Sequence, residues 1–287
     1  MNLNLLGIDF EEWYHLELVQ KNFKRKKEMK PTVIQGIDKI LDWLRKNETL
    51  ATFFVVGELL EFKPDLLDII LDNGHEIGFH TMYHTRIDSA DYEKKFEQEI
   101  KRFDKLADGH SKGFRAPSFS LNKKSSWLID LLEKNNYIYD SSVVPAKTNL
   151  YGLPNAQHSP YKISSNNLET HSESSKILEF PLMVRKILGK SIPVGGGFYL
   201  RTLPYKIIKN AFNSYEKKHI PGTFYIHSWE LTPEFMPKVK LPTKENFITY
   251  HNLGKSYKLM KKLLTEFNFT TFSDYIKNMK GDFSYIS

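Results

Sequence analysis

The sequence predicts an α/β protein that folds as a single (β/α) barrel. Short apolar runs alternate along the chain with longer segments of helical periodicity, and this order is typical of parallel βαβ units. The length of 287 residues suits one such barrel, because (β/α) barrels reach ~250 residues as one domain. No internal repeat, low-complexity segment or linker divides the sequence. We therefore expect one domain that spans residues 1–287.

The first half of the chain carries the clearest alternation. Residues 3–10 form a short apolar run that ends in an acidic cluster, so we expect a buried strand there. Apolar side chains recur with helical spacing over 32–46, and a β-branched and aromatic run at 52–56 predicts the next strand. The same reasoning predicts a helix at 64–72, a strand at 75–80, a helix at 92–106, a strand at 113–115 and a helix at 127–134.

The second half of the chain contains an interruption of this pattern. Residues 145–175 are rich in Asn, Ser and Pro and show little periodicity. A loop of that length is uncommon in a compact domain and is often functional, so we expect an excursion over the mouth of the barrel. The alternation then resumes with a strand at 176–180, a helix at 205–217, a strand at 223–227 and a helix at 254–266.

Charge and composition narrow the class of partner. The 41 Lys and Arg residues exceed the 34 Asp and Glu residues, which gives a formal net charge of +7 and favours anionic partners. The basic side chains gather most densely in one run, which consists of Lys21, Lys24, Arg25, Lys26, Lys27 and Lys30. Such a run is most often a solvated face, and its functional reading is contact with a phosphate-bearing substrate. The absence of cysteine excludes disulfides, thiolate metal sites and a cysteine nucleophile.

The N-terminus and the hydropathy pattern predict a cytoplasmic location. The first nine residues, MNLNLLGID, lack the basic start and the unbroken apolar run of a secretory leader. No later stretch approaches the ~18 consecutive apolar residues that a membrane-spanning helix needs.

Polar residues follow several of the predicted strands. The clusters are Asp9, Glu11 and Glu12, then His80 and His84, then Arg115, and finally His227. In (β/α) barrels the catalytic groups collect at this end of the strands. Two imidazoles four residues apart can ligate one metal ion, and a nearby carboxylate completes a three-ligand site that leaves positions open for water and substrate. The sequence therefore predicts a hydrolytic metal site.

Five short stretches of sequence, four of which contain the polar residues named above, can be compared with known motifs. They are GIDFEEW at 7–13, ATFF at 51–54 with GHEIGFHTMYH at 74–84, FRAPSFS at 114–120, GGGFYLR at 195–201 and YIHSWE at 225–230. In order and spacing they resemble the motifs of the NodB-homology polysaccharide deacetylases, carbohydrate esterase family 4. The resemblance covers residues 3–275 and implies a distorted (β/α) barrel that removes the N-acetyl group of an amino sugar.

The resemblance also implies a set of metal ligands. The family's acidic ligand and its two histidines map to Glu11, His80 and His84. The family commonly has Asp at the acidic position, so Glu11 is a departure and the neighbouring Glu12 competes with it. On an extended segment Asp9 and Glu11 point to the same face while Glu12 points away, which favours Glu11. Two nitrogen ligands and one oxygen ligand predict one divalent ion, with Zn²⁺ preferred.

The catalytic roles are likewise implied by the resemblance. Asp9 maps to the general base that activates the attacking water, and Arg115 maps to the arginine that keeps this base ionised and oriented. The backbone N–H of Ser118 would complete an oxyanion hole. His227 maps to the general acid that protonates the departing amine.

Some positions depart from the family pattern. The fourth motif of the family, an Asp followed by Trp, has no clear counterpart, so we expect Glu179 to support His227, with Asp140 as the alternative. Ser228 stands where the family usually has proline after the histidine. Ile226 would line the pocket for the acyl methyl group, or serve as an ordinary core residue.

These observations predict a metal-dependent amino-sugar N-deacetylase. The basic charge and the absence of a leader suggest an intracellular, nucleotide- or polyprenyl-diphosphate-linked sugar of surface-polysaccharide assembly as substrate. We expect loose association with the membrane surface and no nucleic-acid partner. A deformylase, a hydrolase of non-sugar amides and an inactive carbohydrate-binding relative are the alternatives. The combination of Asp9, Arg115 and His227 argues against the last, since a binding module needs none of them.

Overall fold

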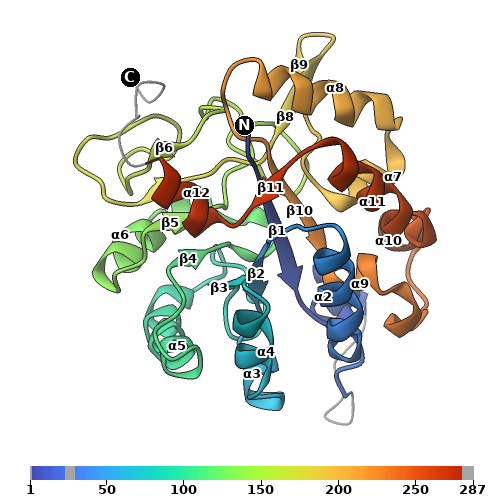
Figure 1. The fold of residues 1–287 in the computed structure, drawn as a ribbon. Helices are drawn as coiled ribbons and strands as arrows, with labels where there is room; N and C mark the ends of the chain where they lie inside the picture. The colour runs from blue at the N-terminus through green and yellow to red at the C-terminus, as the bar shows by residue number, and fades with distance from the viewer. Residues whose placement is uncertain (1, 23–29, 280–287) are drawn as a thin grey trace.

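A computed structural model describes residues 2–22 and 30–279, so Lys24, Arg25, Lys26 and Lys27 of the basic run lie outside the described residues. The described chain forms one curled sheet with helices packed around its outer side (Figure 1). The nine-stranded sheet has the order β10-β1-β2-β3-β4-β5-β7-β6, and β11 pairs with β1 off this path. The predicted α/β class is confirmed, and the sheet has the shape of a half-barrel.

The four adjacent strands at one end of the sheet order are its longest. They are β1 (Asn4–Phe10), β2 (Thr52–Val55), β3 (Glu76–Phe79) and β10 (Thr223–His227). All pairings among them are parallel, as the alternation with helices predicts. Every residue of β1 is buried, which explains the apolar run from Leu5 to Ile8 that precedes Asp9. Parallel register brings the carboxyl ends of these strands to one edge, where the polar residues lie.

The remaining strands of the sheet are only two residues long. They are β4 (Gly113–Phe114), β5 (Tyr139–Asp140), β6 (Tyr161–Lys162), β7 (Leu178–Glu179) and β11 (Phe269–Thr270). Beyond β7 the chain reaches β10 through isolated bridges, Leu182 to Thr223 and Gly196 to Tyr225, instead of a continuous ladder. Because these isolated bridges replace a continuous ladder between β7 and β10, the barrel is distorted at this point.

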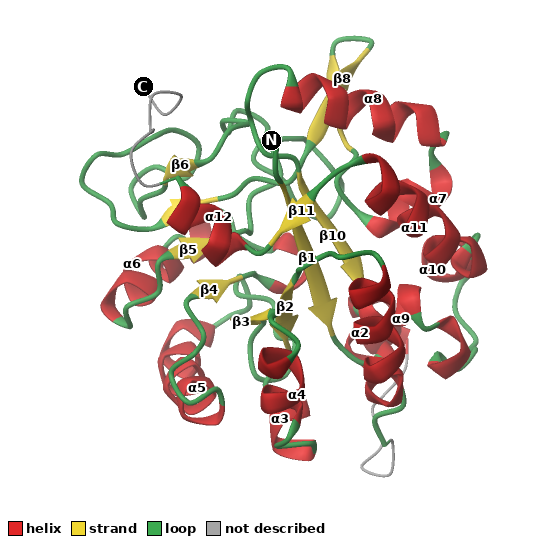
Figure 2. Cartoon of the chain, in the orientation of Figure 1, coloured by secondary structure: helices red, strands yellow, loops and turns green. Residues whose placement is uncertain are grey.

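Amphipathic helices cover the outside of the sheet (Figure 2). They include α2 (Ile37–Lys46), α3 (Glu58–Phe62), α4 (Leu66–Asp72), α5 (Tyr92–Leu106), α6 (Trp127–Lys134), α8 (Tyr205–Glu216) and α11 (Ser256–Glu266). The α5 helix shows how they pack: Phe96 and Phe103 contact Phe79 of β3, with ring centroids 5.8 and 4.4 Å apart. Each fully buried Phe of this kind contributes about 1.5–3 kcal/mol to the free energy of unfolding.

Several short elements lie in segments for which the sequence predicts no structure. They are α1 (Glu17–Asn22), the hairpin of β8 (Val184–Ile187) and β9 (Lys190–Pro193), α7 (Gly197–Thr202), α9 (Ser228–Leu231), α10 (Thr243–Tyr250) and α12 (Phe272–Asn278). The segment 145–175 contains β6 and is otherwise irregular, and its residues 148–151 line the cavity described below. No helix within residues 2–22 and 30–279 is long and apolar enough to cross a membrane.

Candidate active site

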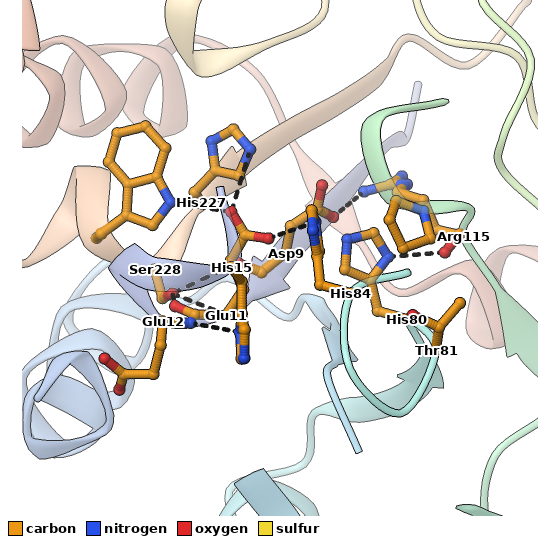
Figure 3. A network of polar contacts seen from close by, with 12 residues as sticks. Asp9, Glu11, Glu12, His15, His80, Thr81, His84, Arg115, His227 and Ser228 are labelled. Atoms are coloured by element: carbon orange, nitrogen blue, oxygen red, sulfur yellow. Dashed lines mark hydrogen bonds and ion pairs between the residues drawn. The ribbon is translucent and has the colours of Figure 1, made fainter. Parts of the chain in front are cut away.

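The predicted site residues meet at the carboxyl ends of four strands (Figure 3). Asp9 on β1 stands in register with His227, the last residue of β10. His80 directly follows β3, Arg115 directly follows β4, and Glu11 lies just beyond β1. Parallel pairing thus brings together residues that are far apart in the sequence.

One cluster in the described chain has the composition of a metal site. Glu11, His80 and His84 are buried, and their candidate ligand atoms all lie within 4.8 Å of one another. Glu11 Oε2 lies 2.7 Å from His84 Nε2. His80 Nδ1 lies 2.7 Å from the carbonyl oxygen of Arg115, so its N–H donates there and Nε2 is left to bind a metal.

The charges of this cluster also suit a cation. Burial alone would raise the pKa of Glu11, but the imidazoles of His84, His227 and His80 hold the pKa of this carboxyl well below its usual range. Burial lowers the pKa of His80 to about 4, so its imidazole is neutral at pH 7, the form that binds metal. An ionised carboxylate with imidazole nitrogens is a donor set that Zn²⁺ and related divalent ions accept. The residues present therefore fit one such ion.

The side chains of the two adjacent glutamates, Glu11 and Glu12, have different partners in the structure. The carboxylate of Glu12 accepts hydrogen bonds from the backbone N–H groups of Thr32, Val33 and Ile34, at 2.9, 3.0 and 2.8 Å, and so caps the turn that leads into α2. Glu11 instead faces the two histidines. These contacts favour Glu11 as the ligand, in agreement with the alternation argument.

Ser228 and Trp229, which directly follow His227, hold Glu11 in place. Trp229 Nε1 donates to Glu11 Oε1 at 3.0 Å. Ser228 Oγ donates to the carbonyl oxygen of Glu11 at 2.8 Å and accepts from the Glu11 N–H at 3.2 Å. Ser228 therefore fixes the backbone of the candidate ligand.

Asp9 and Arg115 form a buried ion pair. Arg115 Nη1 donates to Asp9 Oδ1 at 2.7 Å, and both side chains are almost inaccessible to solvent. The other guanidinium donors reach the carbonyl oxygen and hydroxyl of Ser141, at 3.1 and 3.0 Å. A side chain at Gly7 would collide with this guanidinium, since a Cβ there would lie 2.3 Å from Arg115 Nη1. The arginine is thereby fixed behind the carboxylate that it orients.

The carboxylate that supports His227 is Glu230, so the expectation of Glu179 or Asp140 is wrong. His227 Nδ1 lies 2.8 Å from Glu230 Oε2. Glu230 Oε1 accepts in turn from Arg201 Nε at 2.8 Å. Burial alone would lower the pKa of His227, but the hydrogen bond and charge of Glu230, with the charges of Glu11 and Asp9, raise it to about 8.

Asp140 and Glu179 face each other elsewhere in the barrel. They are partners in the register of β5 and β7, and both are fully buried. Burial raises the pKa of Asp140 to about 6, and burial with the neighbouring Asp140 raises the pKa of Glu179 well above its usual range. Asp140 accepts from Ser142 Oγ at 2.6 Å, and that hydroxyl accepts from the Ala116 N–H at 2.8 Å. The pair therefore supports the segment after Arg115 instead of the histidine.

The reactive groups open into a cavity of about 380 Å³. Asp9, Glu11, His80, His84, Ser118 and His227 all line it. Aromatic side chains make up much of the remaining wall, namely Phe119, Tyr151, Phe198, Tyr199, Tyr225 and Trp229. Ile226 is buried in the core and is not among the lining residues, because side chains alternate along β10 and its neighbours Tyr225 and His227 take the inward positions.

Sequence reasoning missed three residues that shape this site. Glu230 follows His227 by three residues, and the two form a capping box at the start of α9. A glutamate three residues after the residue that precedes a short helix was the available signal. Arg201 and Trp229 lie within the GGGFYLR and YIHSWE stretches, but their contacts are not apparent from these motifs, because each residue acts through a partner distant in sequence. Gly197 permits the approach of α7, since a Cβ there would lie 2.0 Å from Glu230 Oε2.

Replacing Glu230 should change the pH dependence of the reaction. A general acid must be protonated, so activity that depends on His227 falls as pH rises through its pKa of about 8. Glu230→Gln removes the contacts that raise this pKa, and we expect the alkaline limb of kcat to move to lower pH. Each unit of movement lowers activity above the limb about tenfold. A pH profile measures this, and Glu179→Gln is the control whose limb should stay in place. An unchanged limb in Glu230→Gln contradicts the assignment.

Two family models match different parts of the chain. Residues 33–137 match the family model described as polysaccharide deacetylase, and residues 141–277 match a domain of unknown function, DUF3473. The first match contains His80, His84 and Arg115, and the second contains His227 and Glu230.

Curated relatives show the same similarity over part of the chain. A peptidoglycan-N-acetylglucosamine deacetylase from Bacillus cereus is 41% identical over 61 residues, which cover 21% of this chain and 28% of that protein. Peptidoglycan-N-acetylglucosamine deacetylase PgdA from Listeria monocytogenes is 22% identical over 179 residues, 57% of this chain and 38% of that protein. The chain thus matches between about a quarter and two-fifths of the length of these relatives.

Solved structures share the fold over nearly the whole chain. Two proteins assigned to the polysaccharide deacetylases, from Mycobacterium smegmatis and Pseudomonas aeruginosa PAO1, have TM-scores of 0.59 and 0.56 at 14% and 12% identity. The alignments cover 98% and 97% of this chain and 91% and 92% of those chains. The allantoinase PuuE has a TM-score of 0.56 at 12% identity, over 98% of this chain and 92% of its own. Motif order, the matched region and the fold agree: residues 33–137 match the polysaccharide deacetylase family, and the chain shares the fold of solved proteins assigned to it.

Proposed function

We propose that this chain hydrolyses the N-acetyl group of an amino sugar and releases acetate. The observation that carries the proposal is the convergence of Asp9, the Glu11–His80–His84 cluster and His227 on one cavity. A base, a metal-ligand set and an acid are together the components of metal-assisted hydrolysis of an amide.

Glu11, His80 and His84 would hold one divalent ion, with Zn²⁺ preferred for two nitrogen ligands and one oxygen. Such an ion, when bound, would polarise the amide carbonyl and favour ionisation of water at neutral pH. Trp229 and Ser228 keep Glu11 aimed at the two histidines, as a ligand shell requires.

The remaining residues move protons and orient the substrate. Asp9, held by Arg115, accepts a proton from the attacking water. The N–H of Ser118 is available to the carbonyl oxygen, where charge develops. His227, kept protonated by Glu230, donates to the amine nitrogen as the C–N bond breaks. Acetate and the free amino sugar are the products.

The cavity walls support a sugar as the substrate. Tyr151 and Tyr199 stand together with their hydroxyls 2.9 Å apart, and both line the cavity. Aromatic faces pack against the apolar side of a pyranose ring while phenol hydroxyls remain able to bond its hydroxyls. A formyl amide or a non-sugar amide remains the alternative substrate, and the shared fold of allantoinase PuuE shows only that this scaffold is not limited to the polysaccharide deacetylases.

Product analysis tests the proposed reaction. Purified protein supplied with a divalent metal should release acetate from N-acetylglucosamine oligomers and leave a free amine. Formate from N-formyl analogues with no acetate from N-acetyl substrates supports a deformylase. Saturable sugar binding without any product supports an inactive relative, and either result overturns the proposal.

We further propose that the substrate is anionic, as a nucleotide- or polyprenyl-diphosphate-linked sugar is. Lys21 and Lys244 line the cavity, although Lys21 already pairs with Glu17. We expect kcat/KM to be higher for a diphosphate-linked substrate than for a matched neutral oligomer. The advantage should shrink with salt, because exposed charges are screened beyond ~8–10 Å at physiological ionic strength. Equal kcat/KM values that do not respond to salt contradict this part of the proposal. The cytoplasmic location stays a prediction, which cell fractionation tests.

A further inference from the structure

The hairpin β8–β9 presents a leucine to solvent at its tip. Leu188 is 98% exposed and has a φ of 50°, beside Gly189 at 76°. Two-residue hairpin turns with positive φ at both positions favour Asn, Asp or Gly at the first. A leucine there strains the backbone and exposes apolar surface.

A basic cavity lies at the base of the same hairpin. It has a volume of about 360 Å³ between β8 and α8, and its charged or titratable lining consists of His158, Arg185, Lys186, Tyr215 and Lys218. Within the described part of the chain, no carboxylate lines this cavity and its three cationic side chains form no ion pair. Cations gathered without a counter-charge repel one another, and a bound anion would relieve that repulsion.

The hairpin and this cavity lie away from the catalytic groups. The hairpin projects from the end of the molecule opposite the arrowheads of β1 and β10 (Figures 1 and 2). None of the residues lining the basic cavity lines the catalytic cavity. Substrate binding at the catalytic cavity therefore does not account for either feature.

We propose that the β8–β9 hairpin and the adjoining end of α8 form a docking surface for an anionic phospholipid membrane. The basic cavity takes a lipid phosphate, and Leu188 enters the apolar boundary beneath the headgroups. Apolar side chains that enter the boundary beneath the headgroups and cations that face anionic lipid both favour binding to a membrane surface, and this hairpin carries both kinds of side chain. Lys190 on β9 and Lys217 after α8 add exposed positive charge to the same surface.

This docking would fix the direction in which the catalytic cavity faces. The cavity opens at the far ends of the strands, and β1 alone, with 7 residues, spans roughly 20 Å. The cavity would then open away from the lipid. Sugars reaching out from the surface, or soluble sugars, are accessible in this orientation, whereas a sugar joined directly to a membrane-bound diphosphate is not. Of the two anionic substrate forms proposed above, this orientation therefore favours the nucleotide-linked sugar over the polyprenyl-diphosphate-linked one.

Vesicle binding by the full chain tests the proposal without requiring activity. We expect co-sedimentation with phosphatidylcholine vesicles that contain phosphatidylglycerol, and little with phosphatidylcholine alone. Arg185→Gln with Lys186→Gln should weaken binding on the order of 30-fold, because each cation near an anionic surface contributes about fivefold. Leu188→Asn suits the left-handed turn, so the hairpin should fold, and binding should fall about tenfold. The matched control is Lys94→Gln with Lys95→Gln on α5, which removes the same charge.

Three results would overturn the proposal. One is equal binding to both kinds of vesicle, and another is equal loss in the α5 control. The third is the absence of vesicle binding with stabilisation by pyrophosphate that disappears in Arg185→Gln with Lys186→Gln, which would assign the cavity to a soluble phosphate compound. The readout is binding alone, so failure of the proposed deacetylase activity leaves this test intact.

Discussion

Asp9→Asn is expected to lower kcat for N-acetyl hydrolysis about 10²–10⁴-fold, the usual contribution of a general base. The amide cannot accept a proton, although its oxygen can still accept the hydrogen bond from Arg115 Nη1. The variant should also be less stable, by up to about 3–5 kcal/mol, because Arg115 is buried and loses its anionic partner. The bonds of Arg115 to Ser141 remain and reduce that loss. Metal content should stay near the wild-type value, since Asp9 is outside the ligand cluster.

Activity and folding must be separated in that experiment. Acetate release should be measured well below the melting temperature of the variant, with circular dichroism to confirm the fold. Glu12→Gln is the matched control: it removes a buried carboxylate three residues away that caps a helical turn. We expect it to lose stability but to keep turnover within a few-fold. Wild-type turnover in Asp9→Asn would remove Asp9 from the role of base.

The long elements of this fold could be predicted from sequence, and so could the short strands β4 and β7, which lie within the predicted strands 113–115 and 176–180. Periodicity needs several turns or several alternating residues, so α5 and β1 are apparent in the sequence, whereas the two-residue strands β5 and β6 are not. The hairpin β8–β9 is not predicted from the sequence because its turn is Leu-Gly, which lacks the usual Asn-Gly or Asp-Gly signal.

In the candidate site, the residues that motifs contain could likewise be predicted from the sequence, whereas the contacts between distant segments could not. Motif order predicted a cluster of residues at one end of the strands, and six of them line one cavity. The partner of His227 was assigned wrongly because a distant carboxylate was sought, while Glu230 lies within the same motif and is oriented by a capping box. Contacts such as Arg201 to Glu230 depend on how α7 meets α9, which only the folded chain specifies.

Loss of any one residue of the Glu11–His80–His84 cluster is expected to abolish stable metal binding. Purified protein should carry about one divalent ion for a single three-ligand site. Removing a partner that only orients a ligand costs about 10–100-fold in metal affinity, so removing a ligand should cost more. The difference yields a graded series: Trp229→Phe, which frees Glu11 Oε1 from its donor, should lose 10–100-fold, and Glu11→Ala, His80→Ala or His84→Ala should lose over about 100-fold.

Metal analysis after dialysis, with chelator competition for the affinities, measures this series independently of catalysis. The comparison of adjacent glutamates is the sharpest part, because Glu12 differs from Glu11 by one position and by the direction of its side chain. Glu12→Gln should keep the ion, since its carboxylate is committed to the N–H groups of Thr32, Val33 and Ile34. If Glu12→Gln loses the ion while Glu11→Ala retains it, the ligand assignment is displaced by one residue. Full occupancy in both histidine variants would place the ion elsewhere.

Because His80 Nε2 is oriented by the bond of Nδ1 to the Arg115 carbonyl, a shift in the Arg115 segment should weaken metal binding even with all three ligands intact.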